Sequence, residues 1–139
     1  MTLSRADYPL AETQPGKVKG QRGKTLAEIT LDAVLSGDVT MEDLRITPQA
    51  LKAQAEISRA VGRPTLSLNF ERAAELVDVP QDVIMQTYEL LRPGRAKTKQ
   101  QLLDQAELLR SQFKAEGIAR FITEAADTYE QRGLFTYRF

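Results

Sequence analysis

The sequence contains no histidine, no cysteine and no tryptophan among its 139 residues. Zinc fingers, thiol nucleophiles, disulfide frameworks and Ser-His-Asp triads all require histidine or cysteine, so these kinds of site are excluded. A metal ion held by carboxylate and carbonyl oxygens stays open. The 19 basic and 19 acidic residues cancel, whereas a dedicated nucleic-acid-binding protein is expected to be basic overall.

Long apolar runs are also missing. No stretch approaches the ~18 apolar residues of a membrane-spanning helix, and residues 1–8 lack the apolar core of a secretory signal. The length suits one domain of ordinary size. The absence of cysteine is compatible with a reducing compartment. We therefore expect a cytoplasmic protein that does not enter a membrane.

The first 25 residues show neither helical nor strand periodicity and are rich in proline, glycine and lysine. We expect residues 1–25 to form an extended N-terminal arm, either disordered or laid across another surface. Within the arm, Tyr8, Pro9 and Leu10 combine an aromatic ring, a fixed backbone angle and an apolar side chain. These three residues are candidate anchors on a partner.

Helix start and stop signals follow the arm throughout residues 26–139, which we expect to form a helical domain. Thr47-Pro48 is typical of a helix start and Gly62 of a helix end. Thr98 with Gln101 is typical of a capping box, and Thr40 with Asp43 is a variant of that box with a shorter acidic side chain. The fold class is therefore mainly α, with about four to six helices and no internal repeat. The expected elements are a short turn over 31–36 and helices over 48–61, 64–77, the stretch from Pro80 to about 91, and 99–131.

The last expected helix changes its apolar face between residues 113 and 118, which predicts a kink or two separate helices. Residues 134–139 then alternate apolar and polar side chains and carry three aromatic rings. This tail fits a short strand, a plug in a partner's groove, or a segment folded back on its own core.

Candidate chemistry is sparse. Glu71 and Glu75 share one helix face and could serve acid–base chemistry or hold a divalent ion, although such pairs are common by chance and Arg72 can neutralise them. The basic stretch from Arg92 to Lys99 is a possible phosphate-binding spot, but there is no glycine-rich phosphate loop. We expect no catalytic, cofactor-binding or metal-binding residue in this chain.

Charge is zoned along the chain. The net charge is +3 over residues 1–25, −6 over 26–91 and +3 over 92–139. Such zoning can favour one docking orientation on a charged partner. Chance in a short chain is the equally weighted alternative.

Two sequence blocks point to a known family. The blocks are Asp-Leu-Arg-Ile-Thr at 43–47 and Asn-Phe-Glu-Arg-Ala-Ala-Glu-Leu at 69–76, with Asp-Tyr-Pro-Leu at 7–10 before them. Together with shorter matches between about residues 7 and 132, they resemble the small subunit of adenosylcobalamin-dependent diol and glycerol dehydratases. The shorter matches are Gly23–Leu26, Ile29–Leu31, Val34–Ser36, Leu51, Gln54-Ala55, Pro80, Ile84, Tyr88 and Leu91–Pro93.

The resemblance implies a non-catalytic, mainly helical subunit that packs on a large catalytic chain. In that family, large, medium and small chains form a dimer of heterotrimers, and adenosylcobalamin lies between the large and medium chains. Radical chemistry there converts a 1,2-diol into an aldehyde and water. The aromatic tail departs from the polar or basic ends typical of the family. A start so close to Asp7 favours the glycerol type over the diol type, whose small chains often carry a longer N-terminal extension.

Our sequence-based hypothesis is therefore the small subunit of a glycerol or propane-1,2-diol dehydratase, inactive alone, in the cytoplasm or in a bacterial microcompartment. The partners are the large and medium subunits, over an interface of about 2,000 Å² or more. The alternative is a free-standing helical module that binds nucleic acid through residues 92–99. Several of the candidate interface residues could instead pair with other residues of this chain. These candidates are Tyr8, Pro9, Leu10, Arg45, Glu71, Arg72, Glu75, Arg92 and Arg95.

Overall fold

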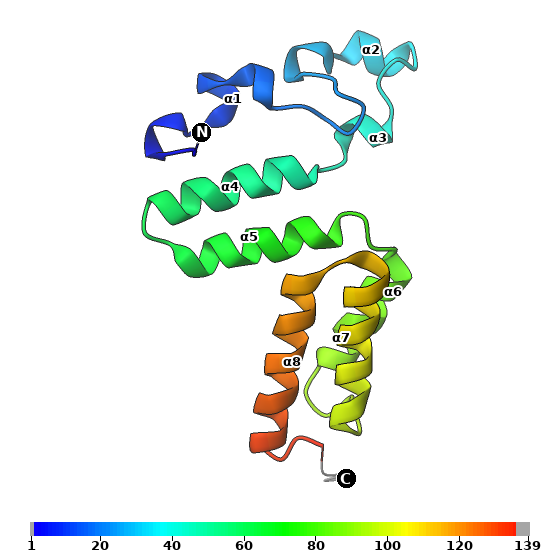
Figure 1. Cartoon of the computed structure of the whole chain (residues 1–139). Coiled ribbons are helices and arrows are strands. Elements are labelled where there is room, and N and C mark those ends of the chain that lie inside the picture. Colours follow the sequence, from blue (N-terminus) through cyan, green and yellow to red (C-terminus); the bar gives the residue numbers. More distant parts are fainter. Residues whose placement is uncertain (1, 136–139) are drawn as a thin grey trace. The chain divides into compact units, whose positions relative to one another are not determined.

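The computed structural model describes residues 2–135, and it is helical with no strand in that range. One isolated antiparallel bridge joins Lys19 to Thr25. The mainly α prediction is confirmed, and the five helices of eleven or more residues agree with the expected number. The chain divides into two compact units, Met1–Val77 and Asp78–Phe139 (Figure 1).

The first unit is built on a hairpin of two long helices, α4 (Pro48–Ala60) and α5 (Pro64–Leu76) (Figure 1). Both begin with proline at the first helical turn, where its missing N–H costs nothing. The Thr47 hydroxyl accepts from the backbone N–H of Ala50 at 3.1 Å, as the sequence predicted. Gly62 adopts a left-handed φ of 78° between the helices, which favours glycine.

The buried face of α5 differs from the apolar stripe in the sequence. The sequence places Leu66, Phe70, Ala73, Ala74 and Val77 on one apolar stripe. Ala74 is buried as this stripe predicts, but Leu66 is 37% exposed and Ser67, which lies off the stripe, is fully buried. The facing helix α4 buries Ala55 and Ser58 in the same way. Small side chains let two helix backbones approach closely. The size of a side chain therefore decides its burial between these helices more than its hydrophobicity does.

Residues 2–25 form short helical turns, although the sequence predicted an extended arm. The turns are Arg5–Asp7 (3-10), α1 (Leu10–Thr13) and Pro15–Lys17 (3-10). A capping box between Ser4 and Asp7 stabilises the first turn. The backbone N–H of Leu3 donates to the Glu56 carboxylate on α4 at 2.9 Å. The N-terminal stretch therefore lies against its own unit, and a domain boundary at residue 25 stays a prediction.

Between this stretch and α4 lie only short helices. They are a 3-10 turn (Leu26–Glu28), α2 (Leu31–Leu35) and α3 (Met41–Leu44). Threonine residues cap the start of each, and the capping box predicted for Thr40 and Asp43 is confirmed.

The second unit contains α6 (Gln81–Leu91), α7 (Lys99–Phe113) and α8 (Glu116–Gln131), with α7 and α8 forming a hairpin (Figure 1). The expected break in the last long segment is thus a boundary between two helices. It falls at Lys114, whose φ of 55° is left-handed. The fully buried side chains of this unit include Leu102, Leu109 and Ile122.

The beginning of the aromatic tail folds onto α8. The Phe135 ring lies 6.3 Å from the Tyr129 ring, centroid to centroid, and the Tyr129 hydroxyl donates to the Leu91 carbonyl. Residues 136–139 lie outside the described residues, so the expected strand or plug stays a prediction. No helix within residues 2–135 has the length and apolar character needed to cross a bilayer.

Candidate subunit interface

Residues 26–46, here called the apolar segment, expose an unusual number of large apolar side chains. Seven of its nine are exposed, and only Val39 is buried. The most exposed are Leu35 at 76%, Met41 at 74% and Leu31 at 73%. Single exposed apolar residues are normal, but a concentration of this kind is typical of interaction sites. The complete set of exposed side chains is Leu26, Leu31, Val34, Leu35, Met41, Leu44 and Ile46.

The exposure follows from the shortness of the local helices. Helices α2 and α3 have five and four residues, which is little more than one turn. A helix of one turn is too short to place a broad apolar stripe toward the core and a polar face toward solvent. The apolar side chains therefore point outward wherever the rest of the chain does not cover them.

Ion pairs hold the N-terminal stretch to the apolar segment. The Arg22 guanidinium donates to both Asp43 carboxylate oxygens, at 2.9 and 2.5 Å, and also to the Asp38 carbonyl at 2.6 Å. Lys24 Nζ lies 3.0 Å from the Asp38 carboxylate. The Asp43 carboxylate also accepts from the backbone N–H of Thr40 at 2.9 Å. These hydrogen bonds, that from Arg22 first, lower the pKa of Asp43 to about 2.

The three arm candidates differ in accessibility. Tyr8 is 61% exposed and free to contact a partner, whereas Leu10 is buried in the unit's own core. Pro9 is half-buried and follows Tyr8 through a cis peptide bond. Of the three, Tyr8 is the one whose position suits an interface.

The charged candidates of the first unit have partners within the chain. Arg45 pairs with Glu42 at 3.1 Å, and Glu71 pairs with Arg59 on α4 at 2.5 Å. Arg72 donates to the Asn69 side chain at 2.6 Å, while Glu75 is half-buried on α5. Among residues 2–135 there is no group of three or more acidic side chains placed to hold a metal ion.

The basic turn after α6 is partly neutralised. Arg92 pairs with Glu89 at 3.1 Å, and Lys99 pairs with Asp127 at 2.8 Å and Glu130 at 3.4 Å. Arg95 is exposed. A phosphate-binding turn would present these charges together, so the nucleic-acid alternative is not favoured.

The charge zones of the sequence cancel within each unit. Residues 1–77 carry ten basic and ten acidic side chains, and residues 78–139 carry nine of each. The basic N-terminal stretch meets acids of the apolar segment through Arg22 and Lys24. Part of the charge zoning thus serves contacts inside the first unit.

The apolar segment itself was missed as a site by sequence reasoning. Of the nine candidate residues, only Arg45 lies within it. The available signal was the excess of leucine, isoleucine, valine and methionine in elements too short to bury them. That excess is visible in residues 26–46, but a buried turn and an exposed turn have the same sequence pattern.

The chain is similar to known proteins over almost its whole length. A family model described as dehydratase small subunit matches residues 3–136. The propanediol dehydratase small subunit of Citrobacter freundii is 47% identical over 131 residues, covering 94% of this chain and 76% of that protein. The propanediol dehydratase small subunit of Salmonella typhimurium is 48% identical over 127 residues, covering 91% and 73%.

The match therefore spans almost all of both compact units, including the apolar segment and the blocks at 43–47 and 69–76. A family model covering this share of the sequence establishes membership, and it confirms the resemblance on which the sequence-based hypothesis depended. The chain belongs to the dehydratase small subunit family.

Proposed function

We propose that this chain is the non-catalytic small subunit of an adenosylcobalamin-dependent dehydratase acting on a 1,2-diol, and that it packs on the large subunit through the apolar segment. The observation that carries the proposal is the exposure of seven large apolar side chains in residues 26–46. Burying a leucine or methionine side chain is worth about 1.5–3 kcal/mol. Such a surface therefore favours a permanent partner over a free monomer.

The chemistry is assigned to other chains of the complex. The chain has no histidine or cysteine, and the grooves among its described residues include two of about 370 and 350 Å³. Those volumes are at the lower end of the range for drug-sized ligands, and a corrinoid with its nucleotide is much larger. We assign adenosylcobalamin to the large and medium subunits, as the resemblance to the dehydratase family implies.

The assembly we propose is a dimer of heterotrimers in the cytoplasm, either free or enclosed in a bacterial microcompartment. The substrate is glycerol or propane-1,2-diol, and the large subunit selects between them. The small chain contributes to the stability of the large chain and has no turnover by itself.

The first test is co-expression of this chain with the large and medium dehydratase chains encoded beside it, followed by mass determination of the purified complex. We expect all three chains in equal amounts, and no dehydratase activity from the small chain alone. Turnover by the isolated small chain, or its absence from the complex, would contradict the proposal.

The second test uses the double variant Leu31→Ser/Leu35→Ser. Because both side chains are more than 70% exposed, the free energy of unfolding of the isolated variant should lie within about 0.5 kcal/mol of that of the parent chain. Its affinity for the large subunit should fall about 100-fold or more, since two buried leucines are lost from the interface. Isothermal titration or biolayer interferometry measures the affinity. The matched control is Met85→Ser, which removes a half-exposed apolar side chain from α6 and should bind like the parent.

A further inference from the structure

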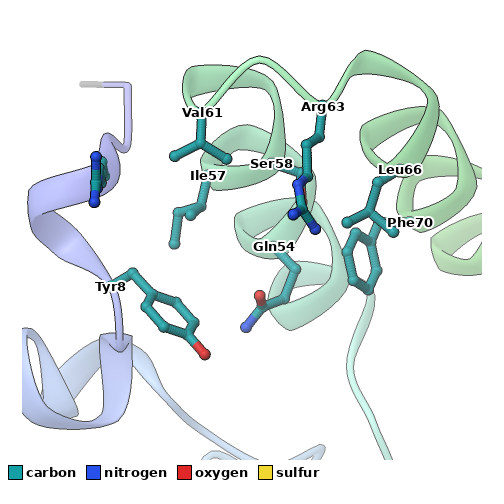
Figure 2. Close-up of a pocket in the computed structure, with 9 residues that line it drawn as sticks. Tyr8, Gln54, Ile57, Ser58, Val61, Arg63, Leu66 and Phe70 are labelled. Carbon is teal, nitrogen blue, oxygen red and sulfur yellow. The ribbon is translucent and has the colours of Figure 1, made fainter.

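The first unit carries a groove apart from the apolar segment. It has a volume of about 370 Å³ and lies between the N-terminal turn and helices α4 and α5. Figure 2 shows Tyr8 on one side of the opening, with Ile57, Val61, Leu66 and Phe70 on the helices opposite. Tyr8, Val61 and Leu66 are 61%, 43% and 37% exposed. The groove thus offers an apolar floor that no described side chain fills.

The charge of the groove is of one sign. Its lining includes Arg5 and Arg63 and no acidic residue. Neither arginine forms an ion pair with any of residues 2–135. Five other arginines of the same range are paired, namely Arg22, Arg45, Arg59, Arg92 and Arg110. Both guanidinium groups are exposed, so each is available to pair with a carboxylate of a partner.

We propose that this groove receives a bulky apolar side chain, flanked by an aspartate or glutamate, from another subunit of the dehydratase. The inference rests on the proposed function, because it takes for granted that the chain works in a complex. The apolar side chain would lie against Tyr8, Ile57 and Phe70, and the carboxylate would pair with Arg5 or Arg63. This groove would give the small subunit a second contact with its partners in addition to the apolar segment, and the contact would combine polar and apolar groups.

The composition of the groove favours a protein segment over a small free acid. Tyrosine and arginine are the residues enriched at the energetic centres of protein interfaces. An arginine–carboxylate pair adds geometric specificity through two parallel hydrogen bonds. The seven exposed apolar side chains of the apolar segment make only non-directional contacts, so the groove would help to set the orientation in which the two subunits meet.

The test exchanges the charge at the groove in the full chain, with Arg5→Glu and Arg63→Glu made singly and together. Arg63 stands at the N-terminal end of α5, where an acidic side chain is favourable to the helix, so the fold should be kept. The matched control is Lys52→Glu, an exposed residue of α4 outside the groove. Circular dichroism melting curves establish that each variant is folded.

Binding to the co-expressed large and medium subunits is measured at low and high salt. We expect each groove variant to bind about tenfold more weakly at low salt, with a flatter salt dependence, because an attractive pair becomes a repulsive one. Lys52→Glu should bind like the parent chain. Groove variants that bind as tightly as Lys52→Glu at both salt concentrations would overturn the inference.

A crosslinking experiment identifies the occupant directly. The photoreactive residue p-benzoylphenylalanine replaces Tyr8 in the three-chain complex, and mass spectrometry locates the crosslinked peptide. We expect a peptide of the large or medium subunit that contains an aspartate or glutamate beside an apolar residue. Crosslinks only within the small chain, or only between two small chains, would contradict the proposal.

The two proposals fail in different ways. If the parent chain does not bind the other subunits at all, the proposed function is wrong. If the parent binds, and Leu31→Ser/Leu35→Ser loses affinity while the arginine variants do not, the proposed function stands and the groove has no such role.

Discussion

At the scale of single residues, Asp43 connects more parts of the first unit than any other side chain described above. It is 2% exposed, caps α3 through the backbone N–H of Thr40, and accepts two hydrogen bonds from Arg22. A buried carboxylate is tolerated only when its oxygens are satisfied in this way. Asp43 is therefore a structural group, and its low pKa is the result of its partners.

The pKa of Asp43 predicts a loss of stability in acid. The carboxylate has a pKa of about 2 in the folded chain and about 3.9 when unfolded. The unfolded chain thus binds more protons around and between those values, so the stabilisation is complete above about pH 5 and is lost progressively as the pH falls through 4 toward 2. Urea unfolding of the parent and of Asp43→Asn at several pH values measures this effect. The variant should lack this part of the pH dependence, and identical profiles would contradict the prediction.

Removing a buried hydroxyl group should affect the stability of the chain differently at Thr87 and at Ser67. The Gln105 amide donates to the Thr87 hydroxyl at 2.8 Å between α7 and α6, so Thr87→Val should cost about 1–3 kcal/mol by leaving the amide unpaired. The Ser67 hydroxyl is buried without a hydrogen-bond partner, so Ser67→Ala should be neutral or slightly stabilising. Denaturant unfolding of both variants gives the comparison. A large loss for Ser67→Ala would show that its hydroxyl has a partner.

At the scale of elements, the first unit combines one regular hairpin with a long irregular covering. Helices α4 and α5 pack closely because small residues face each other. Residues 2–46 form only short turns, which cannot form stable helices alone. Their order depends on contacts such as the Arg22–Asp43 pair and on close backbone approaches.

The closest backbone approach predicts the effect of one glycine substitution. A Cβ atom at Gly20 would lie 2.5 Å from the Asp43 carbonyl oxygen, so Gly20→Ala must push the N-terminal stretch away from α3. We expect a loss of about 1–3 kcal/mol. The control is Gly16→Ala, where a Cβ atom meets nothing within 4 Å and the change should stay within about 1 kcal/mol. Thermal melting compares the two variants, and equal melting temperatures would contradict the predicted contact.

At the scale of the whole molecule, the chain consists of two compact and separately neutral units. Each has its own hairpin of long helices, α4 with α5 and α7 with α8 (Figure 1). Among residues 2–135, the exposed large apolar side chains are concentrated in the first unit, whereas those of the second unit are Met85, Tyr88 and Phe121. This distribution is why we assign the main interface to the first unit.

The two units predict a localised response to a core substitution. Ile122 is fully buried in the second unit, so Ile122→Ala should destabilise that unit by about 2–5 kcal/mol. Hydrogen–deuterium exchange should show faster exchange across α7 and α8 and little change across α4 and α5. Uniformly faster exchange along the chain would show that the two units unfold together.

Much of the helical structure could be predicted from the sequence because its signals are local. Thr47-Pro48, the Thr40–Asp43 box and the Thr98–Gln101 box each act within one turn of helix, and all three are confirmed. The shift of the apolar face near residue 115 marked the boundary between α7 and α8 correctly. The short turns before residue 26 were missed, since they lack periodicity.

The helical class, the long helices and the family could all be predicted from the sequence, because capping residues, prolines and family motifs are local features of the chain. Which side chains meet between distant parts of the chain depends on the tertiary structure. The partner of Asp43 lies 21 residues away, and Glu71 pairs with Arg59 rather than remaining available for chemistry. Likewise, the apolar segment became a candidate interface only when the fold left it uncovered. Burial depends on what packs against a residue, and the residue's sequence neighbours do not specify that.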